Sequence, residues 1–331
     1  MSHRVAVIGA GLAGAACARQ LADADWQVEL FDKGRGPGGR LSSRRAETPL
    51  GELTFDHGAQ YLTTQSESFS AKVRAWMVKG VAESWTARLV KLDDRGLTRP
   101  ITALAWVGRP RMSAIVAAEL DGQVAWFGTE ITSVIGTPGA WRLVDLDGVE
   151  HGFYEAVVVA TPAEQAIPLL SDLEPRFADR ARTVRTAPCW ALMAAFDEPL
   201  DAPFDGAEIA RGPLSWVARN SSKPGRGEAE TWVVHAAPGW SREHLEVPKE
   251  EAVGALTEAF LRRVRGPDPV WTAAHLWRYA MVTRIAATPF LWDERQKVGA
   301  CGDWLLGARG ELAWRSGDEL GAAMIDGATD P

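Results

Sequence analysis

A glycine-rich turn near the N-terminus limits the possible folds of this chain more than any other sequence feature. An apolar run over residues 4–8 is typical of a buried strand, and the alanine-rich segment after the turn is typical of a helix. Between them Gly9, Gly11 and Gly14 have the spacing GxGxxG, and the next predicted strand ends at Asp32. This succession of strand, glycine turn, helix, strand and acid predicts a dinucleotide-binding, Rossmann-like domain.

Each residue of this motif has a physical reason to stand where it does. Gly9 allows the tight turn, Gly11 lets the backbone approach a pyrophosphate, and Gly14 allows the helix to pack closely. The pyrophosphate is expected at the start of the helix, where free N–H groups and the helix dipole favour negative charge. Asp32 is expected to accept a hydrogen bond from a ribose hydroxyl.

Length and charge indicate a chain of about two domains and give no sign of nucleic-acid or membrane binding. Its 331 residues exceed the size at which one hydrophobic core usually keeps growing. The net charge of −7 gives no basic footprint for nucleic acid, and an anionic membrane surface would repel it. The N-terminal residues lack the apolar core of a signal peptide, and no apolar run could span a bilayer, so we expect a cytoplasmic protein.

The cysteines give no sign of a metal site or a disulfide framework. Cys17, Cys189 and Cys301 stand far apart, and none belongs to a CxxC or CxxH pair. We therefore expect three buried thiols and no bound metal ion.

The rest of the chain alternates between predicted helices and short strands. Turn-separated alternating runs between residues 124 and 159 predict a meander or hairpin array, which closes with a buried parallel strand at 156–160. The other predicted elements are helices at 68–79, 112–120, 249–265 and 317–325 and strands at 215–218, 231–236, 271–280 and 298–303.

Two further segments indicate which dinucleotide is bound. KGRGPGGR, residues 33–40, is a second glycine-rich loop whose Arg40 can pair with the far side of the same pyrophosphate. Gly302 and Asp303 follow a predicted strand near the C-terminus. Both segments resemble those of the FAD-dependent amine oxidase superfamily, where the late Gly-Asp meets the flavin ribityl chain. The resemblance implies that Asp303 holds a ribityl hydroxyl and that the next helix points its N-terminus at the isoalloxazine.

Within that superfamily the chain resembles the bacterial renalases. The stretches that carry the resemblance are KGRGPGGRLSSRR (33–45), FDHGAQYLT (55–63), LSWVARNSSKP (214–224), ETWVVHAAPGWS (230–241), HLWRYA (275–280) and CGDWLLGARGELAWRSG (301–317). The resemblance implies an FAD enzyme that oxidises the 2- and 6-dihydro isomers of NAD(P)H to NAD(P)+. Dioxygen then takes the electrons and gives hydrogen peroxide. Arg111 and Leu312 stand where relatives tend to have glycine.

The resemblance also implies a two-domain architecture of the α/β (α+β) class. Residues 1–64, 108–188 and 286–331 are expected to form a Rossmann-like FAD-binding domain of the amine oxidase type, and an inserted antiparallel-sheet substrate domain takes residues 65–107 and 189–285. The expected contacts of non-covalent FAD are Gly9, Gly11, Leu12, Ala13, Gly14, Asp32, Lys33, Gly39, Arg40, Leu41, His57, Gly58, Ala59, Val124, Thr161, Gly302, Asp303 and Ala313.

Hydride transfer from a dihydropyridine needs positioning more than acid–base help. Gln60, Tyr61 and His235 are therefore expected to act as catalytic positioning groups. The expected substrate contacts are Gln60, Tyr61, Thr63, Arg219, Asn220, His235 and Tyr279, with Trp216 and Trp277 as walls. Structural roles explain the polar residues equally well, and core packing is the better explanation of the two tryptophans.

His57 directly follows Asp56, which suggests an Asp–His dyad. No serine or cysteine motif accompanies the pair, and hydride transfer needs no base, so we expect a turn histidine satisfied by backbone groups.

Two other functions stay open beside a renalase-like oxidase. One is a flavin amine oxidase that acts on a small amine, and the other is a sensor that binds flavin or NAD without turnover. For the oxidase, the expected partners are a small dinucleotide substrate and dioxygen, with neither nucleic acid nor membrane.

Overall fold

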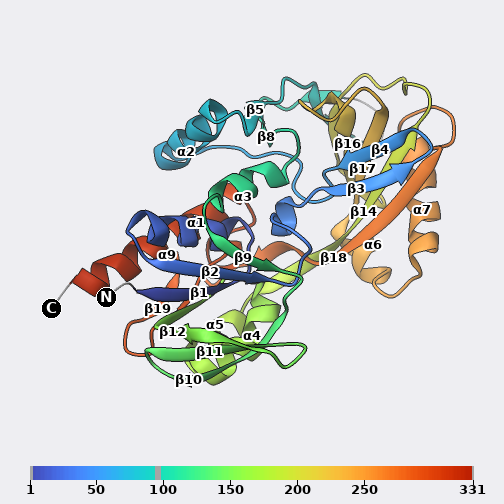
Figure 1. Cartoon of the computed structure of the whole chain (residues 1–331). Helices are drawn as coiled ribbons and strands as arrows, with labels where there is room; N and C mark the ends of the chain where they lie inside the picture. The colour runs from blue at the N-terminus through green and yellow to red at the C-terminus, as the bar shows by residue number, and fades with distance from the viewer. Residues whose placement is uncertain (1–2, 94–97, 330–331) are drawn as a thin grey trace.

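The computed structural model describes residues 3–93 and 98–329, and its strands gather into two large sheets (Figure 1). The first sheet has six strands in the order β19-β20-β13-β1-β2-β9. Its members are β1 (Arg4–Ile8), β2 (Gln27–Asp32), β9 (Val124–Phe127), β13 (Ala156–Val159), β19 (Leu291–Asp293) and β20 (Val298–Ala300). The neighbours β20, β13, β1, β2 and β9 run parallel, and only β19 is antiparallel. This is the Rossmann-like sheet that the glycine motif predicts.

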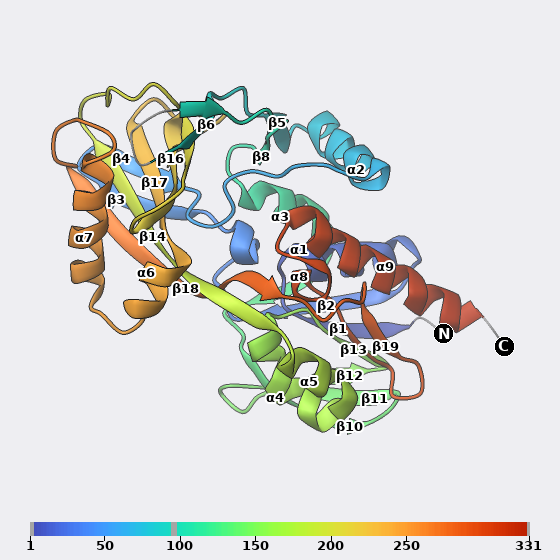
Figure 2. The same ribbon diagram turned by 180° about the vertical axis from the view of Figure 1, so that it is seen from behind.

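Two helices pack beside this sheet, and a glycine lets their backbones approach each other closely. They are α1 (Leu12–Asp23) and α9 (Gly310–Thr329), which lie side by side in Figure 2. A Cβ atom at Gly317 would lie 1.9 Å from the carbonyl oxygen of Ala13, so no larger residue fits at this crossing. The last helix begins well before residue 317, where the sequence predicted its start.

A small antiparallel sheet and two helices lie below the Rossmann-like sheet in Figure 1. The sheet consists of β10 (Ile131–Thr137), β11 (Ala140–Asp145) and β12 (Glu150–Tyr154), as the meander prediction expects. Strand β9 does not belong to that array, since it pairs in parallel with β2. The helices α4 (Ala163–Leu173) and α5 (Pro175–Arg182) were not predicted.

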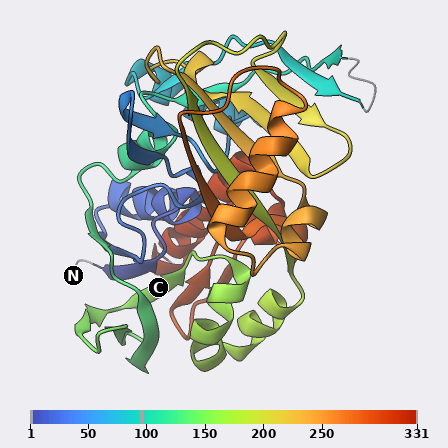
Figure 3. The same ribbon diagram turned by 90° about the vertical axis from the view of Figure 1, so that its right-hand side faces the viewer.

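The second large sheet has seven strands in the order β18-β14-β17-β16-β15-β6-β7. They are β6 (Leu89–Leu92), β7 (Thr98–Pro100), β14 (Arg185–Phe196), β15 (Gly206–Ile209), β16 (Leu214–Arg219), β17 (Glu230–Ala236) and β18 (Trp271–Arg284). Two helices, α6 (Pro238–Glu243) and α7 (Lys249–Leu261), pack near it; Figure 3 shows α7, in orange, lying over the strands. Phe260 of α7 packs against Trp232 of β17, with ring centroids 5.3 Å apart.

The domain prediction assigns two segments to one domain, whereas the structure packs them against the other. The hairpin β3 (Arg44–Thr48) and β4 (Gly51–Phe55) lies within residues 1–64, yet Phe55 stacks on Trp271 of the second sheet at 5.1 Å. The helix α2 (Glu67–Val78) lies within residues 65–107, yet its Phe69 packs against Trp314 of α9 at 5.4 Å. The exact domain boundaries therefore stay a prediction.

The remaining short elements connect these units. They are the 3-10 helices η1 (Gly39–Leu41) and η2 (Asn220–Ser222), the strands β5 (Ala82–Ser84) and β8 (Trp106–Gly108), and the helices α3 (Ser113–Glu119) and α8 (Asp303–Leu306). Among the described helices, none combines the length and apolar character that crossing a bilayer requires.

Candidate functional site

The glycine turn after β1 leaves room for a ligand at one of its three glycines. Gly9 has φ +111°, and a Cβ there would lie 2.9 Å from the backbone of Ala160. A Cβ at Gly14 would lie 2.0 Å from the carbonyl oxygen of Gly9. At Gly11 the nearest atom, the Cα of Gly39, is 4.0 Å away. Protein packing thus requires glycine at positions 9 and 14, whereas the space beside Gly11 is open to a ligand.

Asp32 connects this turn to the second glycine-rich loop. Its two carboxylate oxygens accept hydrogen bonds from the backbone N–H of Ala10 at 2.7 Å and of Gly34 at 2.6 Å. Each oxygen keeps further acceptor capacity for a ribose hydroxyl. Beside the same turn, the hydroxyl of Thr161 is buried and has no hydrogen-bond partner among the described residues. A dinucleotide at this turn would fit both groups.

Arg40 and Asp303, which the sequence assigns to different parts of the cofactor, pair with each other. The Arg40 guanidinium donates to the two carboxylate oxygens of Asp303 at 2.8 and 2.6 Å. The loop that carries Arg40 also approaches the first turn, since a Cβ at Gly39 would lie 3.1 Å from Gly11. This bidentate ion pair fixes the geometry of both side chains, and a bound cofactor would meet them as one unit.

Of the other expected cofactor residues, Gly58 and Ala59 adjoin the same loop. Ala59 donates its backbone N–H to the carbonyl of Arg40 at 2.8 Å, and a Cβ at Gly58 would lie 2.1 Å from that carbonyl oxygen. Gly302 donates to the hydroxyl of Ser316 at 2.9 Å. The side chains of Leu12, Ala13 and Leu41 are buried, and Ala313 lies in the first turns of α9.

Val124 and Lys33 lie farther from the turn. The register of β2 and β9 places Phe127 opposite Asp32 and places Val124 opposite Glu29, toward the other end of the strand. Because ligands bind outside the carboxyl ends of parallel strands, Phe127 is better placed than Val124 for the predicted adenine contact. Lys33 extends toward Glu130, with 3.5 Å between its Nζ atom and the carboxylate.

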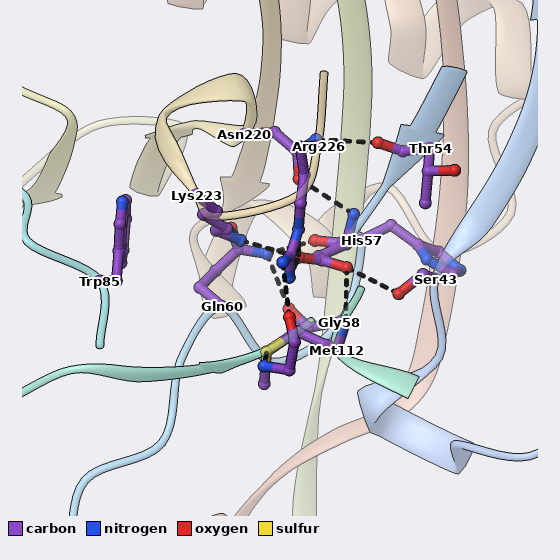
Figure 4. Close-up of polar contacts among 12 residues, drawn as sticks. Ser43, Thr54, His57, Gly58, Gln60, Trp85, Met112, Asn220, Lys223 and Arg226 are labelled. Atoms are coloured by element: carbon purple, nitrogen blue, oxygen red, sulfur yellow. Dashed lines mark hydrogen bonds and ion pairs between the residues drawn. The ribbon is translucent and has the colours of Figure 1, made fainter. Parts of the chain in front are cut away.

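Asp56 is the centre of a buried polar network, and Figure 4 labels its partners Ser43, Met112, Lys223 and Arg226. One of its carboxylate oxygens accepts from the hydroxyl of Ser43 at 2.6 Å and from the N–H of Met112 at 3.0 Å. The other accepts from Lys223 at 3.3 Å and from Arg226 at 2.5 Å. Burial alone would raise the pKa of Asp56, but the two cations, together with the hydrogen bonds from Ser43 and Met112, bring this pKa to about 2.

Lys223 connects this network to Gln60. Its side chain is fully buried, which lowers its pKa to about 8 against the opposing pull of Asp56. The ammonium donates to the side-chain oxygen of Gln60 at 3.0 Å, and the Gln60 amide donates to the carbonyls of Asp56 and Gly58 at 2.5 and 3.0 Å. The Gln60 amide is therefore hydrogen-bonded within the protein at both its oxygen and its nitrogen.

The sequence expectation for His57 is wrong in one respect, because its ring is not satisfied by backbone groups. Its Nδ1 atom is buried and has no partner among the described residues. The ring packs instead on His275 and Trp277 at 4.9 and 5.0 Å between ring centroids (His57 is labelled in Figure 4). The backbone carbonyl of His57 accepts from the indole of Trp277 at 3.0 Å and meets the ring Nε2 of His235 at 3.2 Å.

These histidines are held neutral. Burial, and then the charges of His275, His235 and Arg44, lower the pKa of His57 to about 3. Burial likewise lowers the pKa of His235 to about 4. At neutral pH both rings are uncharged, and a base of so low a pKa is poorly suited to remove a proton. The contacts of Asp56 also argue against an Asp–His dyad, because its carboxylate pairs with Lys223 and Arg226.

A cavity of about 380 Å³ lies beside this network. It is lined by Ala59, Gln60, Tyr61, Leu62, Thr63, Trp216, His235, Ala308, Arg309 and Gly310. It thus brings together four of the seven expected substrate residues and one of the two expected tryptophan walls. Tyr61 and Trp216 are neighbours in its wall, with ring centroids 5.7 Å apart and planes inclined by 50°.

The other expected substrate residues do not line this cavity. Asn220 is fully buried, where it donates to the carbonyl of Thr54 at 2.8 Å. Arg219 donates to the carbonyl of Leu200 at 2.9 Å and lies over the ring of Trp232. Tyr279 and Trp277 belong to β18, outside the lining residues.

Sequence reasoning missed three residues of this region. Lys223 and Arg226 stand in a glycine- and proline-rich segment that reads as an exposed turn. Arg309 stands in the stretch that resembles the flavin-facing helix, and that resemblance drew attention to the helix rather than to the side chain before it. The charge of these residues was the one available signal.

Comparisons with known proteins agree with this architecture. A family model described as an NAD(P)-binding Rossmann-like domain matches residues 7–77. A curated relative, the tRNA 5-methylaminomethyl-2-thiouridine biosynthesis bifunctional protein MnmC of Polaromonas naphthalenivorans, is 26% identical over 99% of this chain. The chain spans 57% of the length of that relative.

Several solved structures have the same fold over almost their whole length. One is a putative protoporphyrinogen oxidase from Exiguobacterium sp. 255-15 (TM-score 0.76, 12% identity, 98% of this chain and 99% of that one). Another is cyclohexylamine oxidase from Brevibacterium oxydans (TM-score 0.75, 11% identity, 98% and 99%). A third is putrescine oxidase bound to putrescine (TM-score 0.73, 12% identity, 98% and 99%).

The class of the molecule follows from these findings. It is a mixed α/β protein with an NAD(P)-binding type of Rossmann-like domain and the fold of the amine oxidases. Because these structural neighbours are only 11 to 12% identical, they show the fold of this chain and not its reaction.

Proposed function

We propose that this chain is an FAD-dependent oxidase that converts the 2- and 6-dihydro isomers of NAD(P)H to NAD(P)+, as its resemblance to the bacterial renalases implies. The balanced reaction takes one dihydropyridine, one proton and one dioxygen, and gives NAD(P)+ and hydrogen peroxide. The carbon–hydrogen bond of the dihydropyridine breaks with its electron pair, so no protein nucleophile is needed.

The observation that carries the proposal is the lining of the 380 Å³ cavity. Its wall contains the aromatic pair Tyr61 and Trp216 and no carboxylate among the described lining residues. A flat, uncharged dihydropyridine ring can pack on such a wall. The indole of Trp216 lines the cavity, and its buried N–H has no partner among the described residues.

The dinucleotide turn fits FAD as the acceptor. The open space at Gly11, the N-terminus of α1, the Asp32 carboxylate and the unpartnered hydroxyl of Thr161 would hold its pyrophosphate and ribose. Bound FAD supplies a hydride acceptor and then reduces dioxygen. The contribution of this chain is to hold the donor ring in the cavity in a near-attack position and to limit water there.

A paired experiment tests the cofactor assignment. Gly11→Ala adds a methyl group where the protein leaves space, so we expect a folded protein that binds FAD far more weakly. Gly254→Ala is the matched control, because a Cβ at Gly254 likewise meets no close neighbour, but on α7, away from the turn. Flavin absorbance and thermal unfolding of the purified proteins would be measured. Equal flavin content in the two variants would contradict the assignment.

The reaction is tested by anaerobic mixing with possible donors. We expect the flavin of the wild-type protein to bleach rapidly with 2- or 6-dihydroNAD(P) and not with amines. Bleaching by amines alone would favour an amine oxidase, the class of two of the structural neighbours, and here the aromatic pair Tyr61 and Trp216 would be its cage. A protein that binds flavin and reacts with neither would favour the sensor.

A further inference from the structure

Arg309 is a cation in the wall of the cavity, and its guanidinium has no partner among the described residues. It lies directly before α9, and its neighbours Ala308 and Gly310 line the cavity with it. Among residues 3–93 and 98–329, no side chain or carbonyl forms a hydrogen bond or an ion pair with its guanidinium. Its exposed fraction is intermediate, so the group is neither buried in the core nor fully in solvent.

Three other cations of this region form ion pairs. Lys223 and Arg226 pair with Asp56, and Arg40 pairs with Asp303. The carboxylate nearest to Arg309 in sequence, Glu311, instead accepts from the N–H and hydroxyl of Ser66 at 2.7 and 2.6 Å.

The other lining residues leave this charge uncompensated. None of the described lining side chains is acidic, and the imidazole of His235 is neutral at pH 7 because burial lowers its pKa. Among the described lining side chains, an anion that enters the cavity therefore meets the positive charge of Arg309 and no negative charge. A positively charged ammonium ion would be repelled by the same charge.

We propose that Arg309 binds a phosphate group of the substrate, so that the enzyme selects phosphorylated dihydronicotinamide nucleotides over the uncharged riboside. This inference rests on the proposed function and adds the group that determines which form of the dihydropyridine is accepted. Tyr61 and Trp216 hold the ring, and the guanidinium of Arg309 forms charge-assisted hydrogen bonds to the phosphate oxygens. Arg309 is thus a specificity residue that does not touch the reacting carbon.

The test compares substrates that differ only in phosphate. Anaerobic flavin reduction would be measured for the 6-dihydro forms of nicotinamide riboside, mononucleotide and dinucleotide, with the wild type, Arg309→Met and Arg309→Lys. A charge-assisted hydrogen bond of this kind corresponds to roughly 10- to 100-fold in binding. We expect the wild type to prefer the mononucleotide to the riboside by about that factor, and Arg309→Met to lose the preference. Arg309→Lys should keep part of it, because lysine retains the charge without the bidentate geometry.

Arg262→Met on α7 is the matched control. Arg262 is exposed and pairs with Glu258 one turn away, so its loss should leave the preference unchanged. Equal slowing of riboside and mononucleotide in Arg309→Met would mean that Arg309 acts on the cofactor, and it would overturn the proposal. A wild-type enzyme that reduces its flavin equally fast with riboside and mononucleotide would overturn it as well.

A binding measurement separates failure of this inference from failure of the proposed function. If no dihydropyridine reduces the flavin, the proposed reaction is wrong, and calorimetry of the FAD-loaded protein with inorganic pyrophosphate still decides on Arg309. Binding that weakens at least about tenfold in Arg309→Met supports the anion site. Equal binding by both proteins, or none by the wild type, overturns it.

Discussion

Two polar regions meet at Gln60, and they differ in how far their hydrogen bonds are satisfied. On one side Asp56 is fully buried, and both of its carboxylate oxygens accept from cations, a hydroxyl or backbone N–H (Figure 4). On the other side, at the cavity, the guanidinium of Arg309 has no partner among the described residues.

The difference separates groups that hold the fold from groups that can bind a ligand. A buried charge is tolerated only where other groups compensate it, so the Asp56 network is completed by the protein itself. Polar groups that face a cavity without partners are available to a substrate. Within the segment 55–63, the division runs between Asp56, which belongs to the first region, and Tyr61 and Thr63, which belong to the second.

The largest loss of stability is expected when Asp56 is substituted. Asp56→Asn keeps the shape of the side chain but leaves the fully buried Lys223 and Arg226 without an anion. Removing one partner of a buried ion pair typically costs about 3–5 kcal/mol. We expect the free energy of unfolding, measured in urea at pH 7, to fall by about this amount. Ser43→Ala, which removes one neutral donor to the same carboxylate, should cost about 1 kcal/mol.

An Asp56→Asn protein as stable as the wild type would show that the network does not hold the fold. Normal stability combined with lost flavin reduction would reverse the comparison and place Asp56 among the functional groups. The notion that completed hydrogen bonding indicates a structural role would then fail in this molecule.

The second-largest expected effect is the pH dependence of stability that His57 causes. Its pKa falls from an ordinary value of 6.5 to about 3 on folding, mainly through burial. Below pH 6.5 the unfolded chain gains a proton that the folded chain does not, so stability is lost as the pH falls from 6.5 toward 3. At pH 5 this corresponds to about 2 kcal/mol, at 1.36 kcal/mol for each pH unit.

His57→Asn removes this titration. Between pH 7 and pH 5, its free energy of unfolding should therefore fall by about 2 kcal/mol less than that of the wild type. At pH 7 its flavin should be reduced at nearly the wild-type rate, because the neutral ring is not needed as a base. An identical pH response of the two proteins would contradict the burial argument, and a large loss of reduction would restore a catalytic role.

The parts of this fold that local sequence determines could be predicted. The GxGxxG turn, its parallel strands and Asp32 follow from spacing alone, because glycine is required where a Cβ would strike the backbone, as at Gly14. Gln60, Tyr61 and Thr63 were found through the resemblance, and the structure places all three in one cavity with His235. Their roles in the reaction stay a proposal.

The parts that depend on distant pairing could not be predicted. Lys223 and Arg226 read as a solvated turn, and their burial becomes visible only when Asp56 is placed beside them. Arg40 and Asp303 were each assigned to the cofactor, because nothing in the sequence indicates that they pair. The hairpin at 44–55 was missed because many of its residues are charged, and only its buried face, with Leu53 and Phe55, reports the strand.

The smallest effect on stability is expected at Thr63. Its side chain lines the cavity and takes no part in the Asp56 network, so Thr63→Val should change the free energy of unfolding by less than about 0.5 kcal/mol. If its hydroxyl bonds the substrate, the variant should lose roughly 2- to 10-fold in the anaerobic rate of flavin reduction at low substrate. Unfolding in urea and stopped-flow reduction measure the two quantities on the same protein. A large loss of stability with an unchanged rate of flavin reduction would show that Thr63 has a structural role. The structural region would then extend to the end of the segment 55–63.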